Sequence, residues 1–153
     1  MKKSLSFVIV AFVLMMVTSC THNNTTTITP TTNTFTYKTT TYNATTVVQS
    51  SSSLQASDGT TGSAIFIFTS YPTTSGIYQV ATGSSPSSSN QVAINYANLN
   101  TGITYTGAPS ATVNATVTVS STGKVTIVVP TVTVVSRFNS ADTGPFTANL
   151  TQQ

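Results

Sequence analysis

Ionisable side chains are scarce in this chain of 153 residues, which has no glutamate and a single histidine, His22. Its two acidic residues, Asp58 and Asp142, each lie close to a glycine in a sequence typical of turns, and we expect each carboxylate to cap the backbone of its own turn. A serine hydrolase needs a histidine base held next to its nucleophile, and most glycosidases need two carboxylates flanking the scissile bond. Neither arrangement is available here, so we predict that the protein has no catalytic residues and is not an enzyme.

Ligands for metals and cofactors are missing as well. A zinc site needs a cluster of histidine or cysteine residues, and the chain has one of each. A calcium site needs several oxygen ligands with carboxylates among them, and a nucleotide site needs a glycine-rich loop between a strand and a helix. We therefore expect no metal and no cofactor.

Charge of either sign is rare, since charged residues make up 5% of the chain. The net charge of +3 includes Lys2 and Lys3, which precede an apolar run at the N-terminus. The remaining charged residues, three bases against two acids, give +1: Lys38, Lys124 and Arg137 against Asp58 and Asp142. We interpret these bases as solvated strand and turn residues. They form no basic patch that could neutralise a run of phosphates, so we expect no nucleic-acid partner.

The N-terminal residues have the pattern of a secretion signal. Two lysines follow the initial methionine, and residues 5–17 are uncharged and apolar apart from Ser6. A membrane-spanning helix needs roughly 20 apolar residues, so this run is short for one. We therefore predict that residues 1–19 are a signal peptide that is removed from the mature protein.

The single cysteine lies where the apolar run ends. The sequence Val17-Thr18-Ser19-Cys20 resembles the lipobox of bacterial lipoproteins, in which an aliphatic residue and two small residues precede a cysteine. This resemblance implies that signal peptidase recognises Val17, Thr18 and Ser19, and that diacylglycerol is attached to the Cys20 thiol. Two or three acyl chains on one residue anchor a protein to a membrane without a spanning helix. The alternative is an ordinary signal peptide with an incidental cysteine.

Two segments follow the cysteine. Residues 21–34 read THNNTTTITPTTNT, and so polar a segment cannot bury enough surface to offset its ordering entropy. We predict that residues 20–34 are the lipidated cysteine with a flexible spacer, and that residues 35–153 form one domain. Abundant threonine, whose branched Cβ suits a pleated surface, indicates that this domain is all-β.

Alternating apolar residues and intervening turn residues predict about eight or nine short strands. We expect them near residues 35–38, 42–49, 63–69, 76–82, 91–97, 103–105, 113–119, 125–134 and 146–150. Residues 63–69 are apolar on both faces, which predicts a central strand. Residues 113–119 and 125–129 flank the turn 120–123 and predict a hairpin. The alternation shifts by one residue after Pro130, which predicts a bulge or an edge position there.

These features favour a single antiparallel β-sandwich of the immunoglobulin-like kind, with a small up-and-down β-barrel as the alternative. The lipobox, the threonine-rich spacer and the C-terminal strand pattern also resemble the small uncharacterised lipoproteins of Bacteroidota. That resemblance implies a sandwich domain held in the cell envelope outside the cytoplasm, on the outer membrane rather than the inner one. The surface-export signal of that group is absent, because residues 21–25 contain no acidic side chain.

Two functions remain open. The first is a non-catalytic structural or interaction module, tethered to the membrane through Cys20 and contacting an envelope protein. The alternative is a receptor for a small ligand or a glycan, with Tyr96 and Tyr105 on neighbouring strands as its aromatic contacts. The other interpretation of these two tyrosines is that they face into the core. The absence of tryptophan also weakens the glycan hypothesis.

Overall fold

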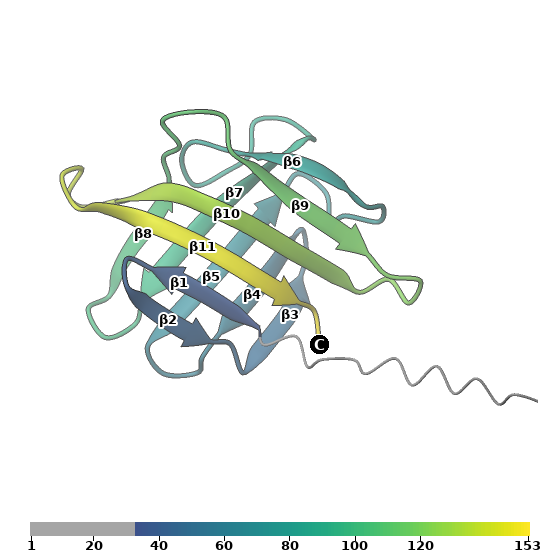
Figure 1. Cartoon of the computed structure of the whole chain (residues 1–153), viewed down its shortest axis with the longest axis horizontal. Helices are drawn as coiled ribbons and strands as arrows, with labels where there is room; N and C mark the ends of the chain where they lie inside the picture. The colour runs from purple at the N-terminus through teal and green to yellow at the C-terminus, as the bar shows by residue number, and fades with distance from the viewer. Residues whose placement is uncertain (1–32) are drawn as a thin grey trace, which may run out of the picture.

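The structure, a computed structural model, describes residues 33–153, which fold into strands and loops without a helix (Figure 1). The strands in chain order are β1 (Thr34–Tyr37), β2 (Thr40–Asn43), β3 (Thr46–Ser50), β4 (Ser53–Ser57), β5 (Gly62–Phe68), β6 (Gly76–Val80), β7 (Gln91–Asn98), β8 (Ile103–Gly107), β9 (Asn114–Val119), β10 (Val125–Ser136) and β11 (Thr143–Thr151). The predicted all-β class is confirmed. The predicted signal peptide and the lipobox residues Val17, Thr18, Ser19 and Cys20 lie outside the described residues.

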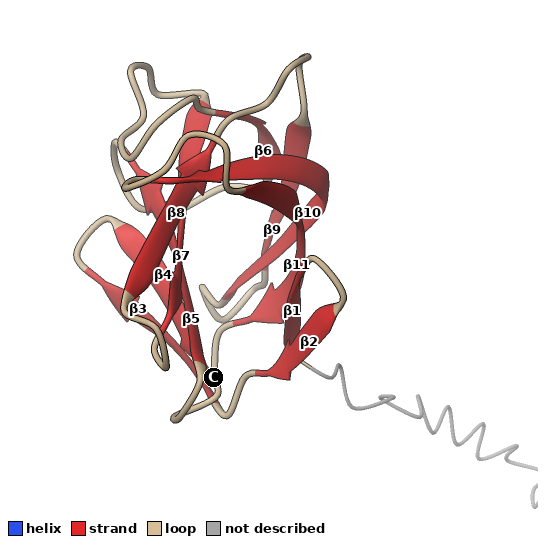
Figure 2. Ribbon diagram, turned by 90° about the vertical axis from the view of Figure 1, so that its left-hand side faces the viewer, coloured by secondary structure: helices blue, strands red, loops and turns tan. Residues whose placement is uncertain are grey.

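All eleven strands belong to one hydrogen-bonded sheet. Its order is β2-β1-β11-β10-β9-β6-β7-β5-β4-β3, and β8 pairs with both β10 and β7. Strand β8 and the pair β6–β9 therefore join β10 to β7 by two routes, so the sheet curls round on itself and leaves β2 and β3 as its edges (Figure 2). The hydrogen bonds continue where a sandwich would separate two sheets.

The expectation of a purely antiparallel sheet is wrong at one place. Strands β6 and β7 run parallel, with Gln79 opposite Gln91 and Val80 opposite Val92. A parallel neighbour needs a long return connection, and the polar segment 81–90 provides it. The segment was recognisable as a loop in the sequence, but its length did not reveal the strand direction.

The strand count exceeds the prediction because residues 40–57 form three short strands, β2, β3 and β4, where one was expected. Between Ala44 and Thr45 the backbone changes the segment with which it is hydrogen-bonded. Ala44 N donates to Asn33 O beside β1, and Thr45 N donates to Ser57 O at the end of β4. The predicted strand 42–49 is thus split between β2 and β3. Strand β4 was missed because only Leu54 and Ala56, both buried, mark its apolar face among serines and a glutamine.

The predicted central strand is β5, which has β7 on one side and β4 on the other. Its inward residues Ala64, Phe66 and Phe68 are buried, whereas Ile65 and Ile67 on its other face are half-buried. Burial on one face follows the alternation of a pleated strand. The strand is therefore central in the sheet, although its second face is only partly covered.

The predicted C-terminal hairpin and bulge are both confirmed. Strands β9 and β10 pair antiparallel with Val117 opposite Ile127, and Gly123 takes a positive φ of 79° in the turn between them. Around Pro130 the register of β10 with β11 shifts between Val129 and Val132. On the other edge of β10, the pairing with β9 ends at Val128 and the pairing with β8 begins at Val134. A residue without an N–H therefore lies where β10 changes neighbours.

The domain has two distinct ends, which we call the loop end and the terminal end. The loop end carries the β1–β2 turn, the β7–β8 turn at residues 99–102 and the β10–β11 loop at residues 137–142 (Figure 1). The terminal end is where β1 begins and β11 ends, and there Thr151 N donates to Asn33 Oδ1 over 2.6 Å. Strand β11 runs from the loop end to the terminal end.

Candidate functional site

Four of the six tyrosines gather behind the loop end, on β1, β2, β7 and β8. Tyr96 and Tyr105 lie directly opposite each other on β7 and β8, and their ring centroids are 5.5 Å apart. Tyr37 packs against both rings, at 4.8 Å from Tyr96 and 4.6 Å from Tyr105. Tyr42 completes the group at 5.7 Å from Tyr96. We refer to Tyr37, Tyr42, Tyr96 and Tyr105 as the tyrosine cluster.

The tyrosine cluster is part of the core. Tyr96 is 0% exposed and Tyr105 is 5% exposed, so the two residues singled out as ligand contacts are brought together but present no ring to solvent. Their position agrees with the alternative interpretation, in which both face inward. Phe146 on β11 packs 6.0 Å from Tyr96 and 6.3 Å from Phe66 on β5, which extends the aromatic packing across the domain.

The phenol groups of the cluster differ in their hydrogen bonds. Tyr42 Oη and Tyr96 Oη share a buried hydrogen bond of 2.6 Å, and Tyr105 Oη donates to Asp142 Oδ2 over 2.8 Å. The Tyr37 hydroxyl is buried and has no hydrogen-bond partner among residues 33–153. Burial raises the pKa of Tyr96 and of Tyr105 well above the ordinary value for a phenol. These groups are therefore neutral donors and acceptors at physiological pH.

Asp142 has a role that its local sequence did not reveal. Its carboxylate accepts hydrogen bonds from Lys38 Nζ over 3.0 Å and from Tyr105 Oη over 2.8 Å, and both contacts lower its pKa. The expectation that Asp142 caps its own turn is therefore wrong. In this loop Asn139 is the cap, because its Oδ1 accepts from Ala141 N over 3.0 Å. Partners 104 and 37 residues away leave no signal in the local sequence.

Lys38 is correspondingly more than a solvated charge. It forms the Lys38–Asp142 ion pair across the loop end, and its ammonium lies 5.2 Å from the centre of the Tyr37 ring. Its own backbone N–H donates to Pro145 O over 2.8 Å, which fixes the β1–β2 turn against β11. The pair therefore joins the β1–β2 turn to the β10–β11 loop.

Asp58 behaves as its sequence predicts, as the acceptor that organises the β4–β5 turn. Its Oδ1 accepts from the backbone N–H groups of Thr60, Thr61 and Gly62 at 2.8 to 2.9 Å, and its Oδ2 accepts from the Thr61 hydroxyl. Burial raises the pKa of Asp58, but these four donors outweigh it and lower the pKa to about 2. Gly62 is required for packing, because a Cβ there would lie 2.6 Å from Tyr42 Cδ1.

The two carboxylates do not form a common site. Asp58 is bound by its own turn, and Asp142 is bound by Lys38 and Tyr105. Within residues 33–153 there is also no group of three or more histidine, cysteine or acidic side chains that could hold a metal ion. The described part of the chain thus offers these two carboxylates as structural groups.

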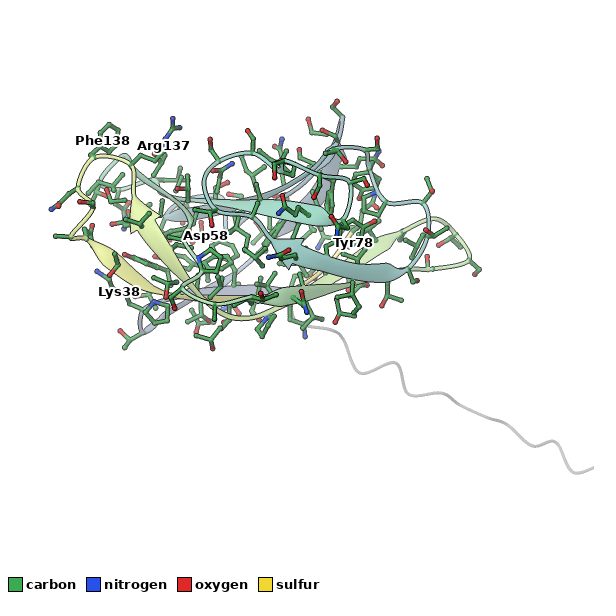
Figure 3. All side chains as sticks on the ribbon, turned by 90° about the horizontal axis from the view of Figure 1, so that it is seen from above. Lys38, Asp58, Tyr78, Arg137 and Phe138 are labelled. Atoms are coloured by element: carbon green, nitrogen blue, oxygen red, sulfur yellow. The ribbon has the colours of Figure 1, made fainter. Side chains whose placement is uncertain are left out.

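The β10–β11 loop carries the most exposed large apolar side chain of the described residues, Phe138, at 78%. Figure 3 shows Phe138 and Arg137 extending outward from this loop, at the opposite side of the domain from Tyr78. No pattern in the sequence marked Phe138 as an exposed residue. An isolated Phe-Asn-Ser sequence after a strand gives no indication of whether the ring turns inward or outward.

Comparison with protein-family models, with curated proteins and with solved structures finds no match to this chain. No helix within residues 33–153 is long and apolar enough to cross a membrane.

Proposed function

We propose that this protein is a lipoprotein of the cell envelope. Acylated Cys20 would anchor it to the outer membrane rather than to the inner membrane. In this proposal residues 1–19 are the signal peptide, and residues 35–153 are a non-catalytic interaction module outside the cytoplasm. The observation that carries the proposal is the position of Cys20, the chain's one cysteine, after Val17-Thr18-Ser19 and at the end of the apolar run.

The arrangement of the domain supports a tether at one end. Strand β1 begins at Thr34, and its first residue pairs with Asn149 near the end of β11, so the N-terminal connection leaves from the terminal end. The loop end, which includes the β10–β11 loop, lies at the opposite end of β11 from Thr34 (Figure 1). A head attached at its terminal end leaves the loop end free to contact a partner or a surface.

The non-catalytic part of the proposal is supported by the state of the ionisable groups. Asp58 and Asp142 are both occupied by hydrogen bonds that lower their pKa values, and a general acid needs the opposite shift. The tyrosine cluster is buried with raised pKa values for Tyr96 and Tyr105, so it offers no phenolate nucleophile. Burial of Tyr96 and Tyr105 likewise gives no support to the glycan-receptor alternative.

We further propose that the domain is best compared with a two-layer sandwich. In support, Phe146 on β11 packs against Phe66 on β5, so the half of the sheet containing β1, β10 and β11 covers the half containing β4, β5 and β7. The parallel pair β6–β7 and the bridging strand β8 depart from the immunoglobulin-like pattern. An interaction module requires only that such a scaffold hold its loops rigidly.

The anchor is tested by expressing the full chain in a bacterium with labelled palmitate and by mass spectrometry of the purified protein. We expect an N-terminal peptide that begins at residue 20 and carries the mass of acyl chains. Cys20→Ala should abolish labelling and cleavage. Ser19→Ala is the matched control, since it keeps a small residue before the cysteine and should be labelled normally. An intact initial methionine or an unmodified thiol on the native chain would refute the proposal.

A further inference from the structure

We propose that the tip of the β10–β11 loop, formed by Arg137 and Phe138, is a second membrane contact, in which the Phe138 ring enters the interface of a phospholipid bilayer. Arg137 would then lie among the lipid phosphates. Phe138 is 78% exposed, and no other large apolar side chain among residues 33–153 is as exposed. Exposure of an aromatic ring to water is unfavourable, so the free energy falls when a partner covers the Phe138 ring.

The loop is built so that Phe138 stays outside. Phe138 N donates to Ser136 Oγ over 3.2 Å, and Ser136 N donates to Asp142 O over 2.9 Å across the base of the loop. Asp142 is also held by Lys38 and Tyr105, which fixes the base of the loop to the core. A tip with this many constraints does not fold its ring back against the domain, and little conformational freedom is lost when it binds.

The charges near the tip favour phospholipid as the partner. Asp142, the acidic residue of the loop, is neutralised by Lys38 at 3.0 Å, and Asp58 on the β4–β5 turn faces the amides of its own turn. Arg137 forms no ion pair within the described residues, so its guanidinium is available for lipid phosphate. An exposed aromatic ring beside a free arginine is the combination that lies at a bilayer interface, with the ring in the acyl boundary.

A second apolar side chain lies at the same end. Leu99 on the β7–β8 turn is 48% exposed, and β8, which follows that turn, is joined to the loop because Arg137 N donates to Thr104 O over 2.9 Å. The β7–β8 turn lies at the same end of the domain as the tip, so Leu99 adds a second exposed apolar side chain to the loop end. The loop end combines two exposed apolar residues with one free cation.

The absence of tryptophan from the chain permits a direct test, because Phe138→Trp introduces a single fluorescent reporter at the tip. The test uses the chain from residue 20 onward with Cys20→Ser, which keeps the whole core and carries no lipid. Its outcome therefore does not depend on whether Cys20 is acylated in the cell. Vesicles of phosphatidylcholine and phosphatidylglycerol in equal parts should move the emission of Phe138→Trp to shorter wavelength.

The matched control is Ile77→Trp, because Ile77 is 59% exposed on β6, away from the loop end. Its emission should stay constant. Adding Arg137→Gln to Phe138→Trp should weaken binding about fivefold, the effect of removing one basic residue near an anionic surface. Vesicles of phosphatidylcholine alone should bind more weakly than the mixture.

Sedimentation with vesicles checks the result on the chain without a reporter, where Phe138→Ser should reduce the bound fraction. The proposal is overturned if Phe138→Trp shows no shift at any lipid concentration, as expected if the tip binds a protein instead. It is also overturned if Ile77→Trp shifts equally, since contact would then not be confined to the tip. Equal thermal unfolding of all variants confirms that each is folded.

Discussion

The two aspartates of this protein lie in similar sequences and are held in opposite ways. Asp58 accepts all four of its hydrogen bonds from residues two to four positions further along the chain. Asp142 accepts from Lys38 and Tyr105, which are 104 and 37 residues away. One carboxylate therefore organises a turn locally, and the other joins three distant segments at the loop end.

This difference changes what each carboxylate stabilises. Three backbone N–H groups of the β4–β5 turn depend on Asp58, so its loss leaves several donors without their acceptor. Loss of Asp142 leaves the ammonium of Lys38, which is 48% exposed and can be hydrated by water, and the single phenol of Tyr105. We therefore expect the local site to matter more for stability and the distant one to matter for the position of the loop.

The largest effect is expected from Asp58→Ala, which should lower the free energy of unfolding by about 2 kcal/mol. Asp58→Asn is the matched control, because its amide oxygen can still accept the backbone N–H groups, and it should cost about half as much. Urea denaturation of the three proteins measures both values. Equal stability of Asp58→Ala and the native protein would show that water replaces the carboxylate without cost.

A smaller effect, about 1 kcal/mol, is expected from Tyr105→Phe, which removes the hydroxyl that donates to Asp142 and keeps the buried ring. A double-mutant cycle with Asp142→Ala should give less than the sum of the single changes, because each change removes the same hydrogen bond. The same cycle of Tyr105→Phe with Asp58→Asn should be additive. Coupling of Tyr105 to Asp58 rather than to Asp142 would contradict the arrangement described here.

The carboxylate of Asp58 also makes the stability of the domain depend on pH. The pKa of Asp58 is lowered from 3.8 to about 2 on folding, so its contribution is present above pH 3.8 and is lost as the pH falls toward 2. With allowance for solvent screening, we expect Asp58 to account for about 1 kcal/mol of the decrease in the free energy of unfolding at low pH. Urea denaturation at pH 5 and at pH 2.5 measures it, and the difference should shrink in Asp58→Asn. An unchanged difference would assign the acid sensitivity elsewhere.

The same contrast explains which parts of the structure could be predicted. The β9–β10 hairpin and the Asp58 turn depend on residues close in sequence, and both follow from alternation and turn chemistry. The parallel pairing of β6 with β7 and the change of pairing partners at Ala44 depend instead on which strands become neighbours. Alternation specifies which face of a strand is buried, but it does not specify which strand lies beside it.

The candidate site divides in the same way. The pairing of Tyr96 with Tyr105 could be predicted, because both residues alternate in phase across the short turn at residues 99–102. The contact of Asp142 with Lys38 could not, since it depends on β1 lying beside β11. Exposure of Phe138 also escaped prediction, because it results from the hydrogen bonds that shape its loop.

The smallest effect is expected from Lys38→Met, which keeps an apolar stem over the Tyr37 ring and removes the charge that pairs with Asp142. The loss of stability should be less than that of Tyr105→Phe, because a partly exposed ion pair gains little over its hydrated ions. It should also disappear at about 1 M salt, where the screening length is about 3 Å. Urea denaturation at low and high salt tests this expectation, with Lys124→Met as the control for loss of an exposed lysine that has no ion pair among the described residues. A loss that persists at high salt would mean that Lys38 stabilises the β1–β2 turn through packing, and the joint between that turn and the β10–β11 loop would then not be electrostatic.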